Sequence, residues 1–389
     1  MRICHVITKP ELGGAQLSTL NLISSLPKDK YQVSIVTSSA GLLKQKFKSL
    51  ENVTAYFSPF LIRPANPIVD ILALIHIFFI YRCRGFRIIH THSSKAGIIG
   101  RWAAFLYNKT QCWLKVKGER CEVVHTVHGW PFNDYQWILV KRFYIFLERI
   151  TAPFTTKIIC VSKKDIETGL KYRIAPKEKF VLIKYGIPLY QFKNSNCNKA
   201  DKKKELGINN NDPVIGMISC LKPQKSPLDY VKACADVYNK LPSINFLLIG
   251  DGVLKKRCKS ELSKSSLNGR FIFTGWRRDV SDILDVIDIV VLTSKWEGLP
   301  IAIIEALSKG KPVVATDAGG CRELIEDGVT GYITRPGQYK DTADRLSSIL
   351  KDKDSLLKMS REAAKSIDES FDIKAMARNI DNLYRSFGT

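Results

Sequence analysis

Short runs of β-branched and other apolar residues alternate with longer amphipathic segments through the first half of the chain. The short runs predict strands at residues 3–8, 33–38, 53–57, 88–91, 123–127, 158–161 and 180–183. The segments between them predict helices at residues 15–26, 68–81, 95–107, 135–150 and 163–172. Continuous apolar strands that alternate with helices are typical of a parallel sheet covered on both faces.

The alternation stops after residue 188 and resumes near residue 212. Polar and basic residues fill this interval, including three consecutive lysines at 202–204. Strands are then predicted at 214–219, 245–249, 271–274, 289–293, 312–316 and 331–334, with helices at 228–240, 253–263, 280–286, 300–308, 321–326 and 342–351, and two more before the end. The sequence therefore predicts an α/β fold with two Rossmann-like, doubly wound parallel-sheet domains.

The predicted domains are residues 1–190 and 212–370, joined by a linker at 191–211. A last helix at 371–389 is expected to pack back on the first domain. Ligands of doubly wound sheets bind beyond the carboxyl ends of the strands. Two such domains that face a cleft would place a ligand between them.

Composition excludes several classes of protein. Of 389 residues, 45% are hydrophobic and 25% are charged, which is ordinary for a globular chain and excludes collagen-like or largely disordered ones. The longest apolar run, Ile71–Ile80, is interrupted by His76 and is too short to span a bilayer. The start reads as a strand and not as a signal peptide, and no cysteine pair has zinc spacing, so a reducing cytoplasm is expected.

Positive charge is concentrated in the first half. The formal net charge is +23, and residues 1–190 carry 28 basic and 11 acidic side chains. An anionic partner is therefore expected: a membrane surface, a nucleic acid or a phosphorylated substrate. A polyanion-binding or nucleic-acid-binding protein stays open as an alternative function, although the chain shows no nucleic-acid-binding motif.

Basic and aromatic residues gather in three segments of this half. The apolar segment at 68–87 ends with three arginines, and the other two segments combine basic residues with Trp137 and Phe143. Such a surface suits an anionic membrane, and the alternative is a buried helix beside scattered charges. The basic residues concerned are Arg82, Arg84, Arg87, Lys115, Lys117, Arg120, Lys141 and Arg142.

A glycine-rich turn joins the first predicted strand to the first helix, at Leu12-Gly13-Gly14-Ala15-Gln16. Glycines at this place let backbone amides approach a phosphate or a sugar at the start of a helix. A tight turn without a ligand is the alternative. The turn lacks the third glycine of a dinucleotide site, which argues against an NAD-dependent oxidoreductase.

A second turn carries the strongest signal. After the strand at 289–293, the chain continues Ser-Lys-Trp-Glu-Gly-Leu-Pro and places Glu297 eight residues before Glu305. Pro300 suits the first helical position, so Glu297 precedes a helix and Glu305 lies about one and a half turns along it. The amides of Gly298 and Leu299 would point at an anion, and the carboxylates could accept sugar hydroxyls.

Two further segments invite a metal or an acceptor. His90-Thr91-His92 places two imidazoles on one face of a strand, but no acidic ligand lies nearby, so acceptor binding by His92, Ser93 and Lys95 is the preferred interpretation. Asp352-Lys353-Asp354 is expected to be a surface turn between two helices. We therefore expect neither a metal nor a cofactor.

These segments together resemble retaining glycosyltransferases of the GT-B type, in glycosyltransferase family 4 (glycosyl transferases group 1). The likeness covers nearly the whole chain, and it implies that the domain at 1–190 lies on the acceptor side and that the domain at 212–370 binds the nucleotide sugar. The matching segments are Glu297–Glu305, Gly13–Gln16, Val127-His128-Gly129, Cys160-Val161-Ser162, Lys184-Tyr185-Gly186-Ile187, Gly250-Asp251-Gly252 and Phe273-Thr274-Gly275-Trp276.

The resemblance implies a role for each position. Lys225 would neutralise the leaving diphosphate, Glu297 would hold a donor-sugar hydroxyl, and His128 would hydrogen-bond the donor sugar. The remaining donor-binding set would be Gly13, Gly14, Lys222, Trp276, Arg277, Gly298, Leu299, Pro300 and Glu305. Glu305 would accept the ribose hydroxyls, and the base would lie against residues 275–277, where Trp276 could stack on it or pack as a core indole.

The resemblance also implies a reaction. A sugar would pass from a nucleoside diphosphate, UDP first, to a glycan or a lipid-linked saccharide by metal-independent front-face displacement. The pathway would be cell-surface polysaccharide synthesis, such as lipopolysaccharide or capsule, and the enzyme would be peripheral on the inner face of the cytoplasmic membrane. One departure is Cys220, at a position where the family commonly has an arginine, so that Lys222 would substitute or the homologue would be catalytically weak.

Overall fold

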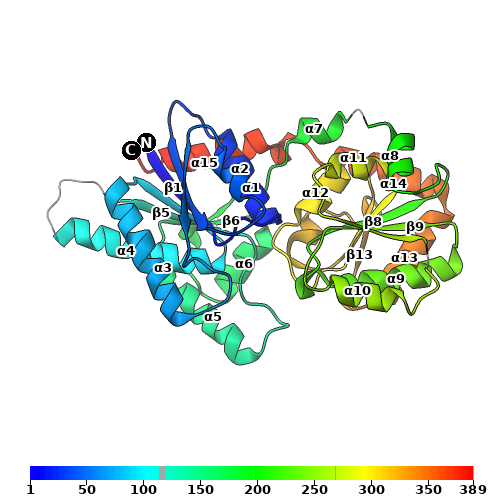
Figure 1. Ribbon diagram of the computed structural model, residues 1–389, viewed down its shortest axis with the longest axis horizontal. Coiled ribbons are helices and arrows are strands. Elements are labelled where there is room, and N and C mark those ends of the chain that lie inside the picture. Colours follow the sequence, from blue (N-terminus) through cyan, green and yellow to red (C-terminus); the bar gives the residue numbers. More distant parts are fainter. Residues whose placement is uncertain (114–119, 196, 268, 389) are drawn as a thin grey trace. The chain divides into compact units, whose positions relative to one another are not determined.

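The computed structural model describes residues 1–113, 120–195, 197–267 and 269–388. It divides into two compact units, one formed by Met1–Tyr185 with Ile373–Thr389 and the other by Gly186–Asp372 (Figure 1). Each unit is a parallel sheet with helices between its strands, which confirms the predicted α/β class.

Unit 1 contains a seven-stranded sheet in the order β3-β2-β1-β4-β5-β6-β7. Every pair of neighbouring strands is parallel. The strands are β1 (Arg2–Val6), β2 (Gln32–Ser38), β3 (Val53–Ser58), β4 (Ile88–His92), β5 (Glu122–Val127), β6 (Lys157–Cys160) and β7 (Phe180–Leu182). β4 is buried along its whole length, as expected for a central strand covered on both faces.

Right-handed crossovers divide the helices of unit 1 between the two faces of its sheet. α1 packs against α15 on one face, while α3, α4 and α5 follow one another on the other (Figure 1). The helices are α1 (Gly14–Ser25), α2 (Lys44–Lys48), α3 (Pro67–Arg84), α4 (Ser94–Trp113), α5 (Ile138–Thr151), α6 (Lys163–Lys171) and α15 (Ile373–Arg385), with short 3-10 turns at Ala152–Phe154 and Lys177–Lys179.

Unit 2 contains a six-stranded parallel sheet in the order β10-β9-β8-β11-β12-β13. Its strands are β8 (Val214–Ile218), β9 (Asn245–Ile249), β10 (Phe271–Gly275), β11 (Ile289–Leu292), β12 (Val313–Thr316) and β13 (Gly331–Thr334). Its helices are α7 (Leu189–Lys193), α8 (Lys199–Glu205), α9 (Pro227–Lys240), α10 (Lys255–Leu262), α11 (Val280–Val286), α12 (Ile301–Ser308), α13 (Tyr339–Lys351) and α14 (Lys353–Ser366), with 3-10 turns η3 (Pro223–Lys225), η4 (Gly319–Glu323) and η5 (Glu369–Phe371).

The division between the units differs from the expected one. Residues 191–211, expected to be a linker, belong to unit 2, where α7 contacts α12 and α8 contacts α11. The chain instead leaves unit 1 after Tyr185 and returns to it at Ile373. The polar composition of 191–211 reflects short helices that lie on the surface of unit 2 with much of their length exposed.

The last helix, α15, is an integral part of unit 1. Tyr384 is fully buried there, and the Tyr31 hydroxyl donates a hydrogen bond of 2.5 Å to Asp381. Lys30 also approaches Asp381, at 3.9 Å, while Arg385 pairs with Asp381 within the helix. The contacts of Tyr31 and Lys30 with Asp381 join α15 to the rest of unit 1.

Among the described residues, no helix combines the length and the apolar composition that crossing a membrane requires.

Candidate functional site

The loops after β8 and β11 carry most of the predicted residues of unit 2, and the loop after β12 packs against the second of these loops. These three strands are neighbours in the sheet and parallel, so their carboxyl ends meet at one edge. This is the edge at which ligands bind in doubly wound sheets.

Lys225 and Glu297 form an ion pair at this edge. The Lys225 ammonium lies 2.5 Å from Glu297 Oε1, and the side chains are 18% and 6% exposed. The Ser294 hydroxyl donates to the same carboxylate oxygen at 2.5 Å. The structure thus brings together a partly desolvated cation and a carboxylate, as the predicted roles require.

Hydrogen bonds fix the two loops that supply this pair. Lys295 donates its backbone N–H to the Gln224 carbonyl at 2.7 Å, and Gln224 Nε2 donates to the Trp296 carbonyl at 2.8 Å. The buried Thr293 hydroxyl is 2.9 Å from the Ser226 carbonyl. The geometry of the pair is therefore set by backbone contacts and not only by the two charges.

The turn between Glu297 and α12 is closely packed. Gly319 has φ +55°, and a Cβ there would lie 2.1 Å from the Glu297 carbonyl oxygen, so only glycine fits. Gly320 donates its N–H to the Gly298 carbonyl at 2.7 Å. Pro300 is the residue that caps α12 and not its first helical residue, because its ψ of 111° is extended.

Two amides of this turn are available to a ligand. Within the part of the chain that the structure describes, the N–H groups of Gly298 and Leu299 have no hydrogen-bond partner. They lie beside the N-terminus of α12 and next to the Lys225–Glu297 pair, a place that favours an anion.

Glu305 lies on α12, one and a quarter turns after the helix starts. It is half-buried, and burial raises the pKa of its carboxyl group to about 8. Hydrogen bonds from hydroxyl groups stabilise a poorly solvated carboxylate more than they stabilise an exposed one.

The end of β10 carries Trp276 and Arg277. The indole is 38% exposed, as a stacking surface must be. Arg277, expected to bind the donor, is instead held by acids: Nε donates to Asp279 Oδ1 at 2.8 Å and a terminal nitrogen to Glu205 Oε1 at 2.6 Å. Its guanidinium group is therefore committed within unit 2.

Cys220 and Lys222 lie between β8 and η3. Cys220 is half-buried directly beyond the strand, and Lys222 precedes the turn that ends in Lys225. The backbone N–H of Lys225 donates to the Lys222 carbonyl at 2.9 Å, which keeps the two lysines on one turn.

Unit 1 carries the glycine turn and His128. Gly13 caps α1 with extended φ of −130° and ψ of 159°, and α1 starts at Gly14. His128 follows β5 directly, and both of its ring nitrogens have partners inside unit 1: Nε2 lies 3.1 Å from His92 Nδ1, and Nδ1 is hydrogen-bonded to the Tyr185 hydroxyl.

The predicted acceptor residues each have a partner within unit 1. His92 is 2% exposed and belongs to a cluster of histidines. Ser93, with φ of 61°, shares a hydrogen bond of 2.8 Å with the Thr8 hydroxyl. Lys95 pairs with Asp70 at 2.5 Å. All three thus have partners within unit 1.

Two groups of residues have spacing that a metal ion could use: His5 with His90 and His92, and Cys197 with Asp282 and Asp285. Hydrogen bonds account for their close approach, since His5 Nδ1 lies 2.9 Å from His92 Nε2. In the second group, the Ser195 hydroxyl donates to both carboxylates, and Lys309 pairs with that of Asp285.

Asp352 caps α14 and accepts the Ser355 N–H at 3.0 Å. This agrees with the predicted turn between two helices.

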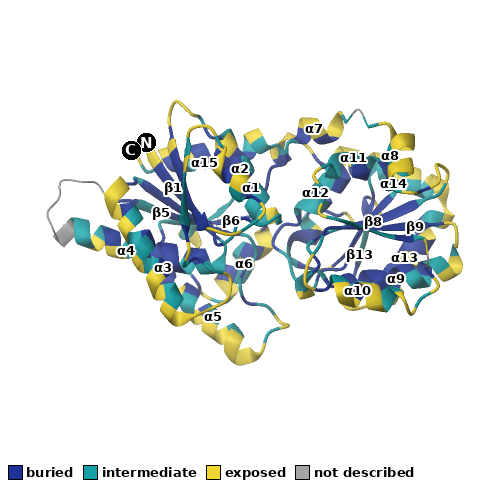
Figure 2. Cartoon of the chain, viewed as in Figure 1, coloured by how far each residue is buried: buried dark blue, intermediate teal, exposed yellow. Residues whose placement is uncertain are grey.

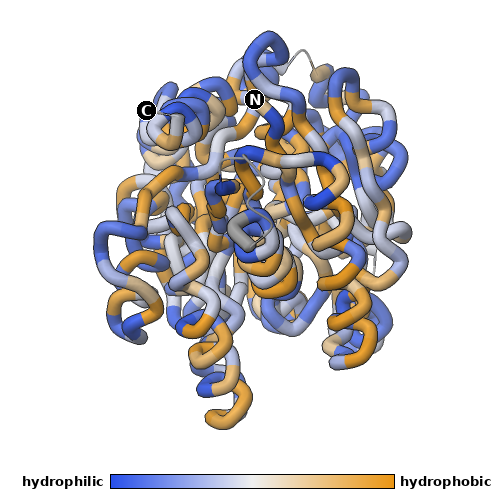
Figure 3. Tube along the Cα trace, turned by 90° about the vertical axis from the view of Figure 1, so that its left-hand side faces the viewer, coloured by the Kyte–Doolittle hydropathy of each residue, from blue (hydrophilic) through white to orange (hydrophobic). Residues whose placement is uncertain are grey.

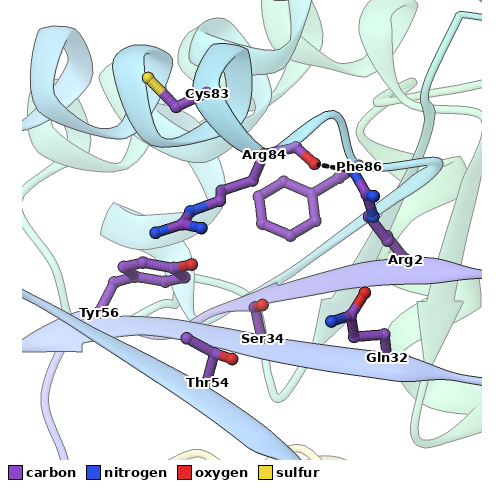
Figure 4. Close-up of a pocket in the computed structure, with 8 residues that line it drawn as sticks. All are labelled: Arg2, Gln32, Ser34, Thr54, Tyr56, Cys83, Arg84 and Phe86. Carbon is purple, nitrogen blue, oxygen red and sulfur yellow. Dashed lines mark hydrogen bonds between the residues drawn. The ribbon is translucent and has the colours of Figure 1, made fainter.

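A cavity of about 220 Å³ lies at the amino ends of the unit 1 strands, away from the carboxyl ends that carry the predicted residues (Figure 4). Arg2 and Gln32, which start β1 and β2, lie on its wall. Arg2 donates to the Arg84 carbonyl at 2.8 Å, and the Arg84 guanidinium lies 5.4 Å from the centre of the Tyr56 ring. Its position at the strand starts separates it from the residues discussed above.

Exposed apolar side chains gather on α3 and α5. Figure 2 colours stretches of both helices as exposed, and Figure 3 shows hydrophobic stretches along the lower part of the trace. More than half of the exposed large apolar residues in the described chain belong to these two regions. They are Ile68, Ile71, Leu72, Ile75 and Phe79 on α3, and Tyr135, Trp137, Ile138, Leu139, Val140, Phe143 and Phe146 in and before α5. We call these residues the apolar surface.

The basic residues expected near this surface are partly in place. Arg82 and Arg84 lie in the last turn of α3, Arg142 is exposed on α5, and Lys141 pairs with Asp134 at 2.5 Å. Lys115 and Lys117 lie outside the described residues, and Arg120 and Arg87 lie beyond the apolar helices, where the Arg87 guanidinium donates to the Arg120 carbonyl.

Sequence reasoning missed three side chains that touch the predicted ones. Ser294 binds Glu297, Tyr185 binds His128, and His5 binds His92. Ser294 could have been found from its place three residues before Glu297. His5 could not, because its proximity to His92 depends on β1 lying beside β4.

Comparisons with known proteins show the family of the chain. Residues 12–191 match the family model described as Glycosyltransferase Family 4, and residues 198–366 match that described as Glycosyl transferases group 1. The chain is 32% identical to an Escherichia coli UDP-Gal:alpha-D-GlcNAc-diphosphoundecaprenol alpha-1,3-galactosyltransferase, over 99% of this chain and 96% of that protein.

A second relative and a solved structure extend the match. The Staphylococcus aureus capsular polysaccharide biosynthesis glycosyltransferase CapM is 23% identical over 94% of this chain and 92% of its own. Anabaena HepE, solved in complex with UDP and glucose, has a TM-score of 0.82 at 21% identity, over 99% of this chain and 100% of that one. This likeness shows the two-domain GT-B fold.

Proposed function

Since the chain belongs to glycosyltransferase family 4, we propose that it transfers a sugar from a UDP-sugar to a lipid-linked saccharide, with retention of the anomeric configuration. The broader activity, glycosyl transfer in the synthesis of a polysaccharide, follows from the family and from its relatives. UDP-galactose is the first donor to test, because the E. coli relative carries it in its name.

The ion pair between Lys225 and Glu297 is the observation that carries the proposal. A diphosphate bound beside Lys225 would compete with Glu297 for the ammonium group. It would also accept hydrogen bonds from the backbone N–H groups of Gly298 and Leu299. Glu297 would then be released to accept a hydroxyl of the donor sugar. A cation and amides positioned before the reaction stabilise the charge that develops on the leaving phosphate.

The proposed chemical step keeps both reacting partners on one face of the sugar. The bond between the anomeric carbon and the β-phosphate oxygen breaks, and a bond from the acceptor oxygen forms on the same face. The acceptor proton passes to the departing phosphate oxygen, so that no protein base is consumed. We propose that this step needs no metal, since Lys225 and the two amides supply the compensating charge.

Cys220 weakens one expected contact, because a thiol cannot donate two hydrogen bonds to a phosphate as an arginine does. Lys222, on the same turn as Lys225, is our candidate for a second cation. We therefore expect an active enzyme whose donor affinity depends strongly on the lysines of this turn.

An assay of product configuration tests the proposal. The protein is incubated with UDP-galactose and a GlcNAc-diphospho-lipid, and the new linkage is assigned by NMR. We expect an α-linked product, and an at least hundredfold loss of rate in Lys225→Ala. Lys240→Ala is the matched control, because Lys240 is also an ion-paired lysine of unit 2, with Asp344 at 2.6 Å. A β-linked product would overturn retention.

The apolar surface on α3 and α5 supports a peripheral position on the inner face of the cytoplasmic membrane. Both helices follow strands of a parallel sheet, so both begin at the edge where His128 lies. Their exposed residues lie largely toward those first turns, with the exposed Arg142 among them on α5, whereas Arg82 and Arg84 lie in the last turn of α3. Apolar side chains beside cations suit an anionic bilayer, and a lipid-linked acceptor would be presented there.

Vesicle sedimentation tests this position. Phe143→Asp and Ile71→Asp remove exposed apolar groups, and Val253→Asp is the control because Val253 is 81% exposed in unit 2. We expect binding to phosphatidylglycerol vesicles to fall several-fold in the first two variants only. Equal binding by all three variants and the parent would contradict the assignment of this surface.

A further inference from the structure

Five of the six histidines of the chain lie on three neighbouring strands, β1, β4 and β5, or directly after them. The register pairs His5 with His90, and side chains alternate along a strand, so His5, His90, His92 and His128 share one face of the sheet. His125 is on the other face, where it binds Thr91.

Three of these rings form a chain of hydrogen bonds. His5 Nδ1 lies 2.9 Å from His92 Nε2, and His92 Nδ1 lies 3.1 Å from His128 Nε2. His128 Nδ1 is then hydrogen-bonded to the Tyr185 hydroxyl. Tyr185 is the last residue of unit 1 before the chain enters unit 2.

The rings of this chain are neutral near pH 7. Burial lowers the pKa of His5 and of His128 to about 3, and it lowers that of His92 well below the ordinary value. A neutral imidazole has one N–H and one bare nitrogen. What can still vary in this chain of hydrogen bonds is the tautomer of each ring, that is, which of its two nitrogens carries the proton.

The tautomers of the three rings are coupled, because each nitrogen-to-nitrogen contact holds one proton. If His5 Nδ1 is protonated, His92 must carry its proton on Nδ1, and so must His128. In the reverse arrangement His128 Nε2–H donates to His92, His92 Nε2–H donates to His5, and the proton of His5 lies on Nε2.

The first ring of the hydrogen-bond chain, His5, determines which of the two arrangements is favoured. His5 Nε2 is buried and has no hydrogen-bond partner among the described residues. A buried N–H without an acceptor is rarer in proteins than an acceptor without a donor. The arrangement that leaves His5 Nε2 bare is favoured, and it places the proton of His128 on Nδ1.

We propose that His92 is a positioning residue, which fixes the proton of His128 on Nδ1 and holds its ring in place. The proposal rests on the proposed function and on the role that the family resemblance implies for His128, a hydrogen bond to the donor sugar. His128 then acts as a hydrogen-bond donor through Nδ1, to Tyr185 in the free protein and to a sugar hydroxyl that replaces Tyr185 in the complex.

A selectively labelled protein tests the tautomer without any substrate. The full chain is prepared with ¹⁵N-histidine, and long-range proton–nitrogen correlations distinguish protonated from bare ring nitrogens for its six histidines. We expect His128 to show a protonated Nδ1 and a bare Nε2. In His92→Leu we expect the His128 Nε2 resonance to shift to that of a bare nitrogen without a hydrogen bond, because the donor to Nε2 is lost.

A matched pair of variants separates positioning from packing. His92→Asn places an amide N–H where Nδ1 was and can still donate to His128, whereas His92→Leu fills the space without a donor. We expect kcat/KM for the UDP-sugar to fall about tenfold in His92→Leu, the effect of one lost buried hydrogen bond, and to recover largely in His92→Asn. His76→Gln, on α3 and hydrogen-bonded to Ser58, is the control expected to change neither readout.

The outcomes separate this inference from the proposed function. A parent protein with the His128 proton on Nε2, or a His92→Leu variant with an unchanged His128 signal, overturns the positioning role whatever the activity is. Full activity in a folded His128→Leu variant overturns the contact between His128 and the donor, while the tautomer result would stand. Far-ultraviolet circular dichroism and thermal melting show which variants are folded.

Discussion

Glu305 should make donor binding depend on pH. If the ribose hydroxyls donate to its carboxylate, the ionised form binds the donor, whereas the free protein holds the proton because burial raises the pKa to about 8. The group is an acid with a raised pKa, so the binding-competent fraction grows as the pH rises toward 8 and levels off above it. The donor must therefore displace a proton when it binds below pH 8.

The size of the effect follows from that pKa. The ionised fraction is about 1% at pH 6, about 9% at pH 7 and about 50% at pH 8. The association constant for UDP-galactose should rise about ninefold from pH 6 to pH 7 and about fivefold from pH 7 to pH 8. Its diphosphate is doubly esterified, so the ligand itself does not titrate in this range.

Isothermal titration calorimetry at the three pH values measures this dependence. Glu305→Gln should remove it and should weaken binding at pH 8 about tenfold, since a hydrogen bond to a charged group is lost. Lys311→Met is the control, because burial lowers the pKa of Lys311 to about 8 as well. A flat profile in the parent, or the parent's slope retained in Glu305→Gln, would refute the reasoning.

Three further substitutions test the packing of unit 1 and the expected phosphate contact of unit 2. Glu148→Ala should lower the free energy of unfolding, measured in urea, by about 3–5 kcal/mol. The fully buried Arg101 guanidinium lies 2.7 Å from Glu148 and would lose its counter-ion. A decrease below about 1 kcal/mol would contradict this expectation. Gly97→Ala should lower the melting temperature, since a Cβ there would lie 2.5 Å from His125 Cε1; an unchanged melting curve would show that the ring can move. Cys220→Arg should tighten donor binding about tenfold by adding a charged phosphate donor, and equal or weaker binding in calorimetry would show that the phosphate lies elsewhere.

The sequence predicts the sheets well because their strands are short, buried and rich in β-branched residues. All thirteen strands lie within a residue or two of their predicted positions. The short helices α2, α7 and α8 were not predicted, since segments of five to seven residues are too short to show a clear helical periodicity. The unit boundary at Tyr185 was missed for the same reason, because α7 and α8 look like a linker in composition while packing on unit 2.

A site residue is predictable where the same short segment also contains the strand, turn and helix that position it. Glu297, the amides after it and Glu305 all belong to one strand–turn–helix segment. The partners of Arg277 were not predictable, because Glu205 is distant in sequence and belongs to the supposed linker. The histidine chain depends on β1 lying between β2 and β4, so that His5 meets residues nearly ninety positions away.

Calorimetric binding of UDP-galactose to Lys225→Met tests the central claim most directly, since Lys225 is the group assigned to the diphosphate. The variant keeps the length of the side chain and removes only its charge, and Lys240→Met serves as the control in the same unit. We predict that Lys225→Met binds at least tenfold more weakly than the parent while Lys240→Met is unchanged. Equal affinity in Lys225→Met and the parent would contradict the claim that this lysine holds the diphosphate.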